Sequence, residues 1–151
     1  MQDIACVLAT HYHPDHMGLI PELMRHGVKL ILMDTQCDSV HFSDYIFTRD
    51  GLPFEPIDET KATVIRCADS RRFLENLGIA GEILSTPSHS PDSVSLVLDS
   101  GECIVGDLDP IDFLEACHGA YPLRDDWERI LCRHPKRILY GHANERIVEM
   151  Q

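Results

Sequence analysis

The chain has 151 residues, of which 44% are hydrophobic and 25% are charged, as is typical of a globular domain with one modest core. Its formal net charge of −12 opposes binding to nucleic acid or to an anionic membrane, because such binding needs clustered lysine and arginine. No apolar run approaches the roughly 18 to 20 residues that span a bilayer, and the first residues lack a secretory signal pattern. We therefore expect a single domain over residues 1–151, located in the cytoplasm.

The first predicted elements are a strand, a loop, a helix and a second strand. Residues 4–9 are nearly all apolar, which predicts a strand buried on both faces. After the loop we expect a helix that stops at Gly27, with an apolar face formed by Leu19, Ile20, Leu23 and Met24. Residues 28–33 are the next strand. Residues 34–62 are less regular, and they form either a lid, which we favour, or peripheral packing.

Strands return in the second part of the chain, at residues 63–66, 82–86, 93–98, 102–106 and 137–141. The Asp-Ser-Gly sequence at residues 99–101 predicts a hairpin turn. A short helix at residues 70–77 should end at Gly78. A later helix at residues 125–133 has a predicted buried stripe of Trp127, Ile130 and Leu131. Because strands and helices alternate, the predicted class is α/β.

The six cysteines are scattered, and no two form a CxxC pair. Their spacing is unlike the disulfide framework of small secreted domains, so we expect reduced and mostly buried thiols. They are Cys6, Cys37, Cys67, Cys103, Cys117 and Cys132.

The loop after the first predicted strand reads His-Tyr-His-Pro-Asp-His at residues 11–16 and is rich in potential metal ligands. His11 and His13, separated by one residue, can point the same way from an extended or tightly turned backbone. Asp15 and His16 then reach a neighbouring position, so one loop can serve two ions. Nitrogen and carboxylate ligands without a thiolate favour zinc, with manganese or iron as alternatives.

A histidine-rich surface loop is the alternative interpretation of this motif. Three further residues argue against it, because each stands at or just beyond the end of a predicted strand, where open α/β sheets place their sites. These residues are His89, Asp107 and His142. A surface coincidence would not supply this repeated placement.

In these motifs the chain resembles the metallo-β-lactamase superfamily. That family has HxHxDH after a strand, followed by a His, an Asp and a final His after later strands. The matching segments here are residues 10–16, Thr-Pro-Ser-His-Ser at 86–90, Val-Gly-Asp at 105–107 and Tyr-Gly-His at 140–142. The resemblance implies an αβ/βα sandwich and metal-dependent hydrolysis.

The resemblance also implies a ligand set for two metal ions. One ion would be held by His11, His13 and His89. The second would be held by Asp15, His16 and His142. Asp107 would bridge both ions, and a bridging water or hydroxide would be the nucleophile. Asp15 would also be catalytic, because it could orient the hydroxide and accept a proton.

The chain departs from the family pattern in two places. Around His89, Ser88 and Asp92 stand where many members have glycines and Ser90 stands where they have threonine, so this loop should follow a slightly different path. Only ten residues precede the first motif, whereas members usually have several strands there. We therefore expect a sandwich without its usual first strands, from a natural short form or a truncation. A second copy should cover the resulting edge, making a homodimer.

The remaining candidates are assigned to structure rather than to the site. His26, His41, His118 and His134 match no family position, and Cys103 is expected in the core. Arg71 and Arg72 could meet an anionic substrate, but a solvated start of a helix is favoured.

For the substrate, Asp107 stands where many true β-lactamases have cysteine, which argues against antibiotic hydrolysis. The ligand set is similar to that of the glyoxalase II, lactonase and nuclease branches, and the acidic chain disfavours nucleic acid. We expect a zinc-dependent hydrolase of a small ester, thioester or lactone. The alternative is a metal-binding remnant with impaired catalysis, or a domain completed by a partner. Hydrolysis of β-lactams or phosphodiesters is a lesser alternative.

Overall fold

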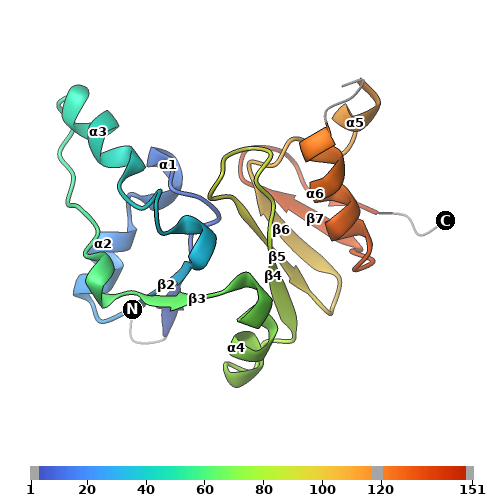
Figure 1. Ribbon diagram of the computed structural model, residues 1–151, viewed down its shortest axis with the longest axis horizontal. Coiled ribbons are helices and arrows are strands. Elements are labelled where there is room, and N and C mark those ends of the chain that lie inside the picture. Colours follow the sequence, from blue (N-terminus) through green and yellow to red (C-terminus); the bar gives the residue numbers. More distant parts are fainter. Residues whose placement is uncertain (1–3, 117–120, 149–151) are drawn as a thin grey trace.

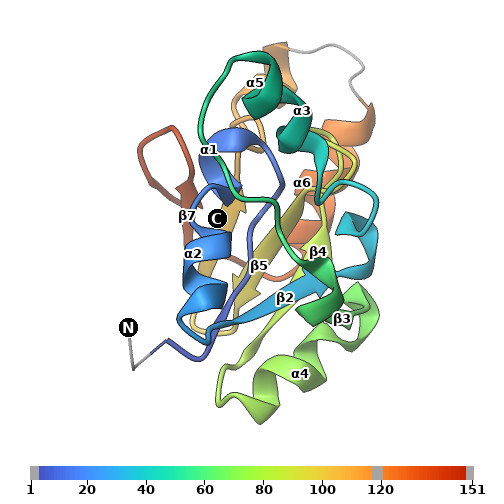
Figure 2. The same ribbon diagram turned by 90° about the vertical axis from the view of Figure 1, so that its left-hand side faces the viewer.

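Two β-sheets form the framework of the molecule (Figure 1). The computed structural model describes residues 4–116 and 121–148. Within them, the first sheet has three strands in the order β1-β2-β3, and the second has five in the order β4-β5-β6-β7-β8. Helices α1 to α3 lie beside the first sheet, and α5 and α6 lie beside the second (Figures 1 and 2). The predicted α/β class and the sandwich of two sheets are therefore confirmed.

The first sheet is parallel throughout, with Cys6 opposite Lys29 and Ile31 opposite Thr63. Parallel strands need crossover connections, and the helices of this half supply them. The elements in chain order are β1 (Cys6–Val7), α1 (Pro14–Met17), α2 (Ile20–Arg25), β2 (Lys29–Met33), the 3-10 turn η1 (Asp34–Gln36), α3 (Phe42–Arg49), η2 (Glu59–Lys61) and β3 (Thr63–Ile65).

The second sheet is mixed: β6 and β7 run parallel, and the other neighbouring strands run antiparallel. Its hairpin turns at Gly101, whose φ of 113° favours glycine, as predicted. The elements are η3 (Cys67–Asp69), α4 (Ser70–Asn76), β4 (Gly81–Ser85), β5 (Val94–Leu98), β6 (Glu102–Gly106), α5 (Phe113–Ala116), α6 (Tyr121–Leu131), β7 (Arg137–Tyr140) and β8 (Arg146–Ile147).

Three clusters of buried side chains hold these layers together. One lies between the first sheet and its helices, and another packs β6 and β7 against α6. The third joins the two halves through Met33 of β2, Leu74 of α4, Ile83 of β4 and Val94 of β5. Each such side chain contributes about 1.5–3 kcal/mol when fully buried, so this cluster fixes one sheet relative to the other.

The strand expected at residues 4–9 is shorter and less buried than predicted. β1 covers only Cys6–Val7 and is half-buried, because it pairs with β2 alone and forms an edge of its sheet. After it, the Ala9 carbonyl accepts a hydrogen bond from the side chain of Gln36 at 3.0 Å instead of one from a neighbouring strand. The prediction of burial on both faces was therefore wrong.

The helices differ from prediction at their ends. Leu19 was expected on a buried face, but it precedes α2 and is 60% exposed. The last helix spans Tyr121–Leu131 instead of residues 125–133, because a helix accepts Pro122 in its first turn, where no N–H is needed. Trp127 and Ile130 are fully buried, as predicted, whereas Leu131, the third residue of the predicted stripe, is only half-buried.

The irregular segment at residues 34–62 contributes to the core, since Val40 and Ile57 are buried against the first sheet. Its helix α3 borders the loop that contains residues 11–16, where Phe42 contacts His13. The segment therefore supplies packing, and its action as a lid stays a prediction.

The cysteines that the structure describes are free thiols, as expected, but the prediction that most of them are buried was wrong, because only Cys103 among them is buried. Cys117 lies outside the described residues. In the part of the chain that is described, none of the helices is long and apolar enough to cross a membrane.

Candidate metal centre

The first group of potential ligands forms around the loop after β1. Tyr12 is fully buried in the first core, and because side chains alternate along an extended backbone, His11 and His13 face the other way. His11 Nε2 lies 3.0 Å from His13 Nδ1, and His89 Nε2 lies 3.2 Å from the same atom. The Thr10 hydroxyl lies 3.2 Å from His11 Nδ1, which leaves Nε2 directed toward the cluster.

The second group combines the start of α1 with the ends of two strands. Asp15 and His16 follow Pro14, which begins the helix. His142 comes after β7, and its Nε2 lies 2.8 Å from Asp15 Oδ2 and 3.2 Å from His16 Nε2. Asp107 comes directly after β6. These four side chains bring their ligand atoms within 4.8 Å of one another, as do the three histidines of the first group.

Asp107 lies between the two groups. Its Oδ2 is 3.3 Å from His16 Nε2 and 3.5 Å from His142 Nε2 in one group. The same oxygen is 3.8 Å from His11 Nε2 and 3.9 Å from His89 Nε2 in the other. Its second oxygen, Oδ1, is buried without a hydrogen-bond partner. A buried carboxylate oxygen without a partner is costly, and a cation would offset that cost.

The chemistry and spacing of these donors fit a metal centre. Ligand atoms about 2.0–2.1 Å from a tetrahedral zinc ion are about 3.3 Å apart. The nitrogen pairs of the first group, at 3.0 and 3.2 Å, are close to that spacing. Burial, together with the neighbouring histidines, lowers the pKa of His11 to about 4. The ring is therefore neutral at physiological pH, which is the form that binds a metal.

The Asp15 carboxylate is kept ionised by its neighbours. Desolvation acts to raise the pKa of Asp15, but backbone hydrogen bonding, His16 and His142 outweigh it and lower the pKa overall. The side chain is 55% exposed, so solvent screens these interactions. Asp15 thus faces the site as a carboxylate that solvent can reach.

Two glycines make room for this arrangement. A Cβ atom at Gly141 would lie 2.5 Å from Asp107 Oδ1 and 3.0 Å from His16 Cε1. Gly106 has a φ of 59°, and a Cβ there would lie 2.6 Å from the Thr10 hydroxyl oxygen. The Gly-Asp and Gly-His pairs of the sequence motifs therefore reflect close approach of the backbone to the ligands.

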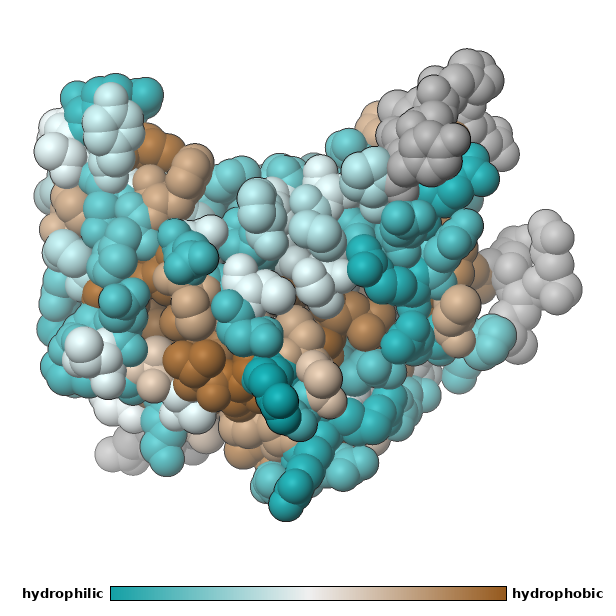
Figure 3. Space-filling model, viewed as in Figure 1, coloured by the Kyte–Doolittle hydropathy of each residue, from teal (hydrophilic) through white to brown (hydrophobic). Residues whose placement is uncertain are grey.

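The site opens to solvent beside the second group. A pocket of about 260 Å³ is lined by three of the ligands and by six other residues, namely His89, Gly106, Asp107, Leu108, Asp109, Pro110, Tyr140, His142 and Ala143. On the other side, the ring of Phe42 lies 5.4 Å from that of His13. The surface is hollowed between α3 and α5 (Figure 3). A small molecule can therefore reach the ligand cluster.

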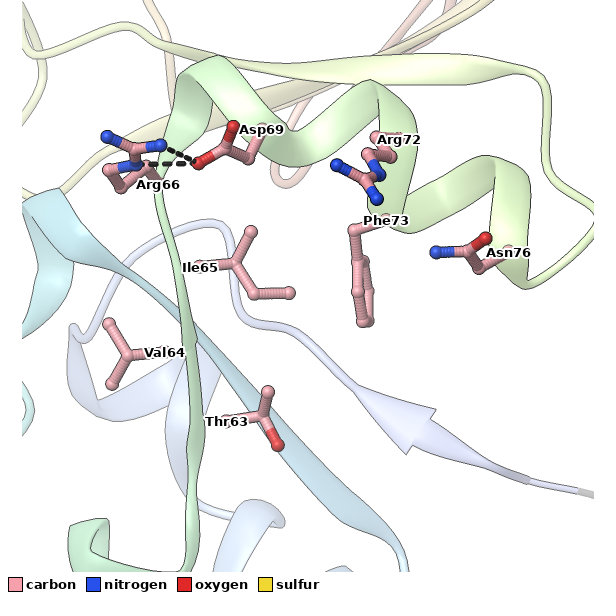
Figure 4. Close-up of a pocket in the computed structure, with 8 residues that line it drawn as sticks. All are labelled: Thr63, Val64, Ile65, Arg66, Asp69, Arg72, Phe73 and Asn76. Carbon is pink, nitrogen blue, oxygen red and sulfur yellow. Dashed lines mark hydrogen bonds and ion pairs between the residues drawn. The ribbon is translucent and has the colours of Figure 1, made fainter.

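A larger pocket of about 490 Å³ lies away from this cluster, between β3 and α4 (Figure 4). Val64, Ile65 and Phe73 line it, together with the ion pair between Arg66 and Asp69. It contains none of the predicted ligands, so its size alone does not identify it as a catalytic site.

The structure brings together every residue that the sequence predicted for the site, in two groups: His11, His13 and His89, and Asp15, His16, Asp107 and His142. The other histidines join neither group among the described residues. His41 contacts Asp44 and Glu59, and His118 lies outside the described residues. Arg71 pairs with Asp99 and Glu82 rather than with the site.

The comparisons with known proteins agree with this geometry. Residues 2–142 match the family model described as the metallo-beta-lactamase superfamily. The chain belongs to that superfamily. Its members are mostly metal-dependent hydrolases. The chain is 27% identical over 141 residues to the beta-lactamase-like protein 2 homolog of Drosophila melanogaster, an alignment that covers 93% of this chain and 45% of that protein. The chain therefore spans about half the length of this curated relative.

Solved structures of the metallo-beta-lactamase superfamily share the fold. TTHA1623, crystallised in a di-iron-bound form, has a TM-score of 0.69 and 21% identity, with coverage of 95% of this chain and 72% of that one. TTHA1429 from Thermus thermophilus has a TM-score of 0.62 and 22% identity, with coverage of 97% and 57%. At these identities the likeness establishes the superfamily fold alone.

Proposed function

We propose that this chain is a dinuclear metal-dependent hydrolase of a small ester, thioester or lactone. The observation that carries the proposal is the position of Asp107, whose Oδ2 lies 3.3–3.9 Å from histidine nitrogens of both ligand groups. Imidazole and carboxylate ligands without a thiolate favour zinc, and manganese and iron accept the same donors. Iron gains support from the di-iron-bound form of TTHA1623.

In the proposed mechanism, His11, His13 and His89 would hold one ion, Asp15, His16 and His142 would hold the other, and Asp107, which lies between the two groups, would serve both. Two divalent ions held there would supply a nucleophilic water of lowered pKa and would polarise the substrate oxygen. The Asp15 carboxylate, whose Oδ2 lies 2.8 Å from His142, orients the attacking water and accepts its proton. The buried face of His11 excludes bulk water from one side of the reaction.

The lining of the pocket supports a neutral acyl substrate. Leu108, Pro110 and Tyr140 give it an apolar wall, and Asp109 adds a negative charge. The described lining includes no lysine or arginine to bind a phosphodiester. Together with the net charge of −12, this favours a small uncharged ester over an anionic polymer.

A substrate panel tests the proposal. Protein loaded with zinc, manganese or iron is assayed against thioesters, lactones, simple esters, phosphodiesters and β-lactams. Turnover of an acyl substrate that disappears with a chelator and returns with metal is the expected result. Two bound ions without any turnover would favour the alternative, a metal-binding remnant with impaired catalysis. Turnover of phosphodiesters or β-lactams alone would replace the proposed substrate class.

We also propose that the chain acts as a single domain in the cytoplasm and pairs with a second copy. Free thiols support the location. For pairing, β3 is an edge strand whose Val64 is 54% exposed, and apolar side chains gather over β3 and α4 (Figure 3). The adjoining groove carries both charge signs, through Arg66 and Asp69, so two copies can be complementary.

Sedimentation velocity tests the pairing. A dimer at micromolar concentration is expected, and Val64→Lys should dissociate it. Ile147→Lys is the matched control, because Ile147 is similarly exposed, at 59%, but lies on β8. A wild-type monomer, or equal effects of the two substitutions, would contradict pairing through β3.

A further inference from the structure

A buried polar cluster connects the two loops that carry the first ligand group. It consists of Gln36, which follows β2, and Asp92, which precedes β5. Gln36 is fully buried and Asp92 is only 4% exposed. Because buried polar groups are costly unless they are hydrogen-bonded, their partners indicate what they hold in place.

Gln36 reaches the metal loop and the His89 loop with one side-chain amide. Its Nε2 donates to the Ala9 carbonyl at 3.0 Å and to the Asp92 carbonyl at 3.2 Å. Its Oε1 accepts from the Met33 amide at 3.1 Å, which anchors the side chain to the end of β2. The same amide group therefore fixes two loops that come from opposite halves of the molecule.

Asp92 acts on the metal loop itself. Its Oδ2 accepts a hydrogen bond of 2.7 Å from the backbone amide of Tyr12, the residue between His11 and His13. The Tyr12 carbonyl in turn accepts a hydrogen bond of 2.5 Å from the Ser43 hydroxyl of α3. Both backbone groups between the two histidines are thus held, and the path from Asp92 to His89 is only three residues long.

We infer that Gln36 and Asp92 are positioning residues that set His11, His13 and His89 in place for the first metal ion before it binds. Neither touches the reacting atoms. They act by fixing the backbone on both sides of the ligands, as partners in the outer shell of metal sites do. This inference rests on the proposed function, because it assumes that the histidine group binds an ion.

Removal and rescue at Asp92 test the inference. Asp92→Ala removes the acceptor for Tyr12, so the affinity of the first ion, measured by calorimetry, should fall roughly 10- to 100-fold. Asp92→Asn keeps an oxygen acceptor and should stay close to wild type. Gln36→Met keeps the length of the side chain but removes its hydrogen-bond donors. It should lower the affinity for the first ion by a similar factor. The Gln36→Met variant also tests the inference if Asp92→Ala does not fold.

Val97→Ala is the matched control, because Val97 is buried in β5 but contacts neither loop through a polar group. It should lower the melting temperature and leave the affinity of the first ion unchanged. Equal losses of affinity in Val97→Ala and Asp92→Ala would overturn the inference, since the effect would then follow general stability. Wild-type affinity in both Asp92→Ala and Gln36→Met would overturn it too.

A readout without metal separates this inference from the proposed function. In the metal-free protein, the Tyr12 amide should be protected from hydrogen exchange. Asp92→Ala should lower the protection factor of this amide at least tenfold. If Asp92→Ala loses this protection while the wild-type chain keeps it but binds no ion, the inference is supported and the proposed function fails. Unchanged exchange at Tyr12 in Asp92→Ala would overturn the inference even if two ions bind.

Discussion

The two ligand groups differ in how much of the fold supports them. In the first group, the side chain of His11 is 1% exposed, and that of His89 is 26% exposed. In the second group, the side chains of Asp15 and His142 are 55% and 62% exposed. The first group is therefore built on the core of the molecule, whereas half of the second group projects from it.

This difference predicts unequal binding of two ions. Ligands that are already fixed lose little conformational freedom when they bind, so the first group should bind its ion more tightly. The exposed ligands of the second group must be ordered by the ion itself. The two ions should therefore load in sequence, and Asp107, which lies between the two groups, should couple the two steps.

Substitution of Asp107 should have the largest effect, because it removes the carboxylate that lies between the two groups. In Asp107→Ala we expect the second ion to be lost at micromolar zinc and turnover to fall roughly a thousandfold, beyond the 10- to 100-fold typical of outer partners. Metal analysis and steady-state kinetics measure this. His26→Ala, at an exposed histidine that belongs to neither group, is the control. Two ions bound in Asp107→Ala would contradict a bridging role.

The contrast between the groups is tested most directly by comparing His142→Ala with His11→Ala. His142→Ala should lower the affinity for the second ion roughly 100-fold, while the first ion stays bound. His11→Ala should weaken the first ion and, through Asp107, the second. Metal titration followed by absorption of cobalt(II) distinguishes the two patterns. If both variants lose both ions equally, the sites are not loaded in sequence.

Much of this site was predictable from the sequence, because the ligands follow strands and motifs have fixed spacing. His89, Asp107 and His142 are far apart in the chain, yet strand ends bring them together. The supporting residues left no such signal. Gln36 lies in an irregular, acidic segment, and two of the groups that it binds, the carbonyls of Ala9 and Asp92, come from segments distant in sequence.

The fold was predictable to a similar extent. Strands with strong apolar patterns, such as β6 at Glu102–Gly106, were placed with correct ends. β1 was overestimated, because an apolar run does not reveal whether one or two neighbouring strands pair with it. The short strand β8 and the short helices α1 and α5 were missed, since their patterns are brief and depend on tertiary contacts.

Gly141 tests how closely the second group is packed. A Cβ atom would lie 2.5 Å from Asp107 Oδ1, so Gly141→Ala must displace the Asp107 carboxylate. We expect the affinity of the second ion to fall about tenfold, with a smaller change for the first. Gly18→Ala is the control at α1, where the added Cβ would make only an ordinary contact of 3.5 Å with the Pro14 carbonyl. Equal affinities in the two variants would contradict this packing.

The smallest effect is expected for metal removal on the core of the second sheet, because the packing of this core does not involve the ligand groups. Cys103, on the strand that leads to Asp107, is fully buried, and burial raises its pKa to about 12. At pH 8 only about one thiol in 10⁴ is then ionised, and the thiolate is the reactive form. Iodoacetamide should therefore label the exposed Cys132 and spare Cys103, with the same result after chelation. Mass spectrometry of labelled peptides measures both. Labelling of Cys103 on metal removal would show instead that the ions hold the second sheet together, and the contrast between a core-built first group and an ion-ordered second group would no longer hold.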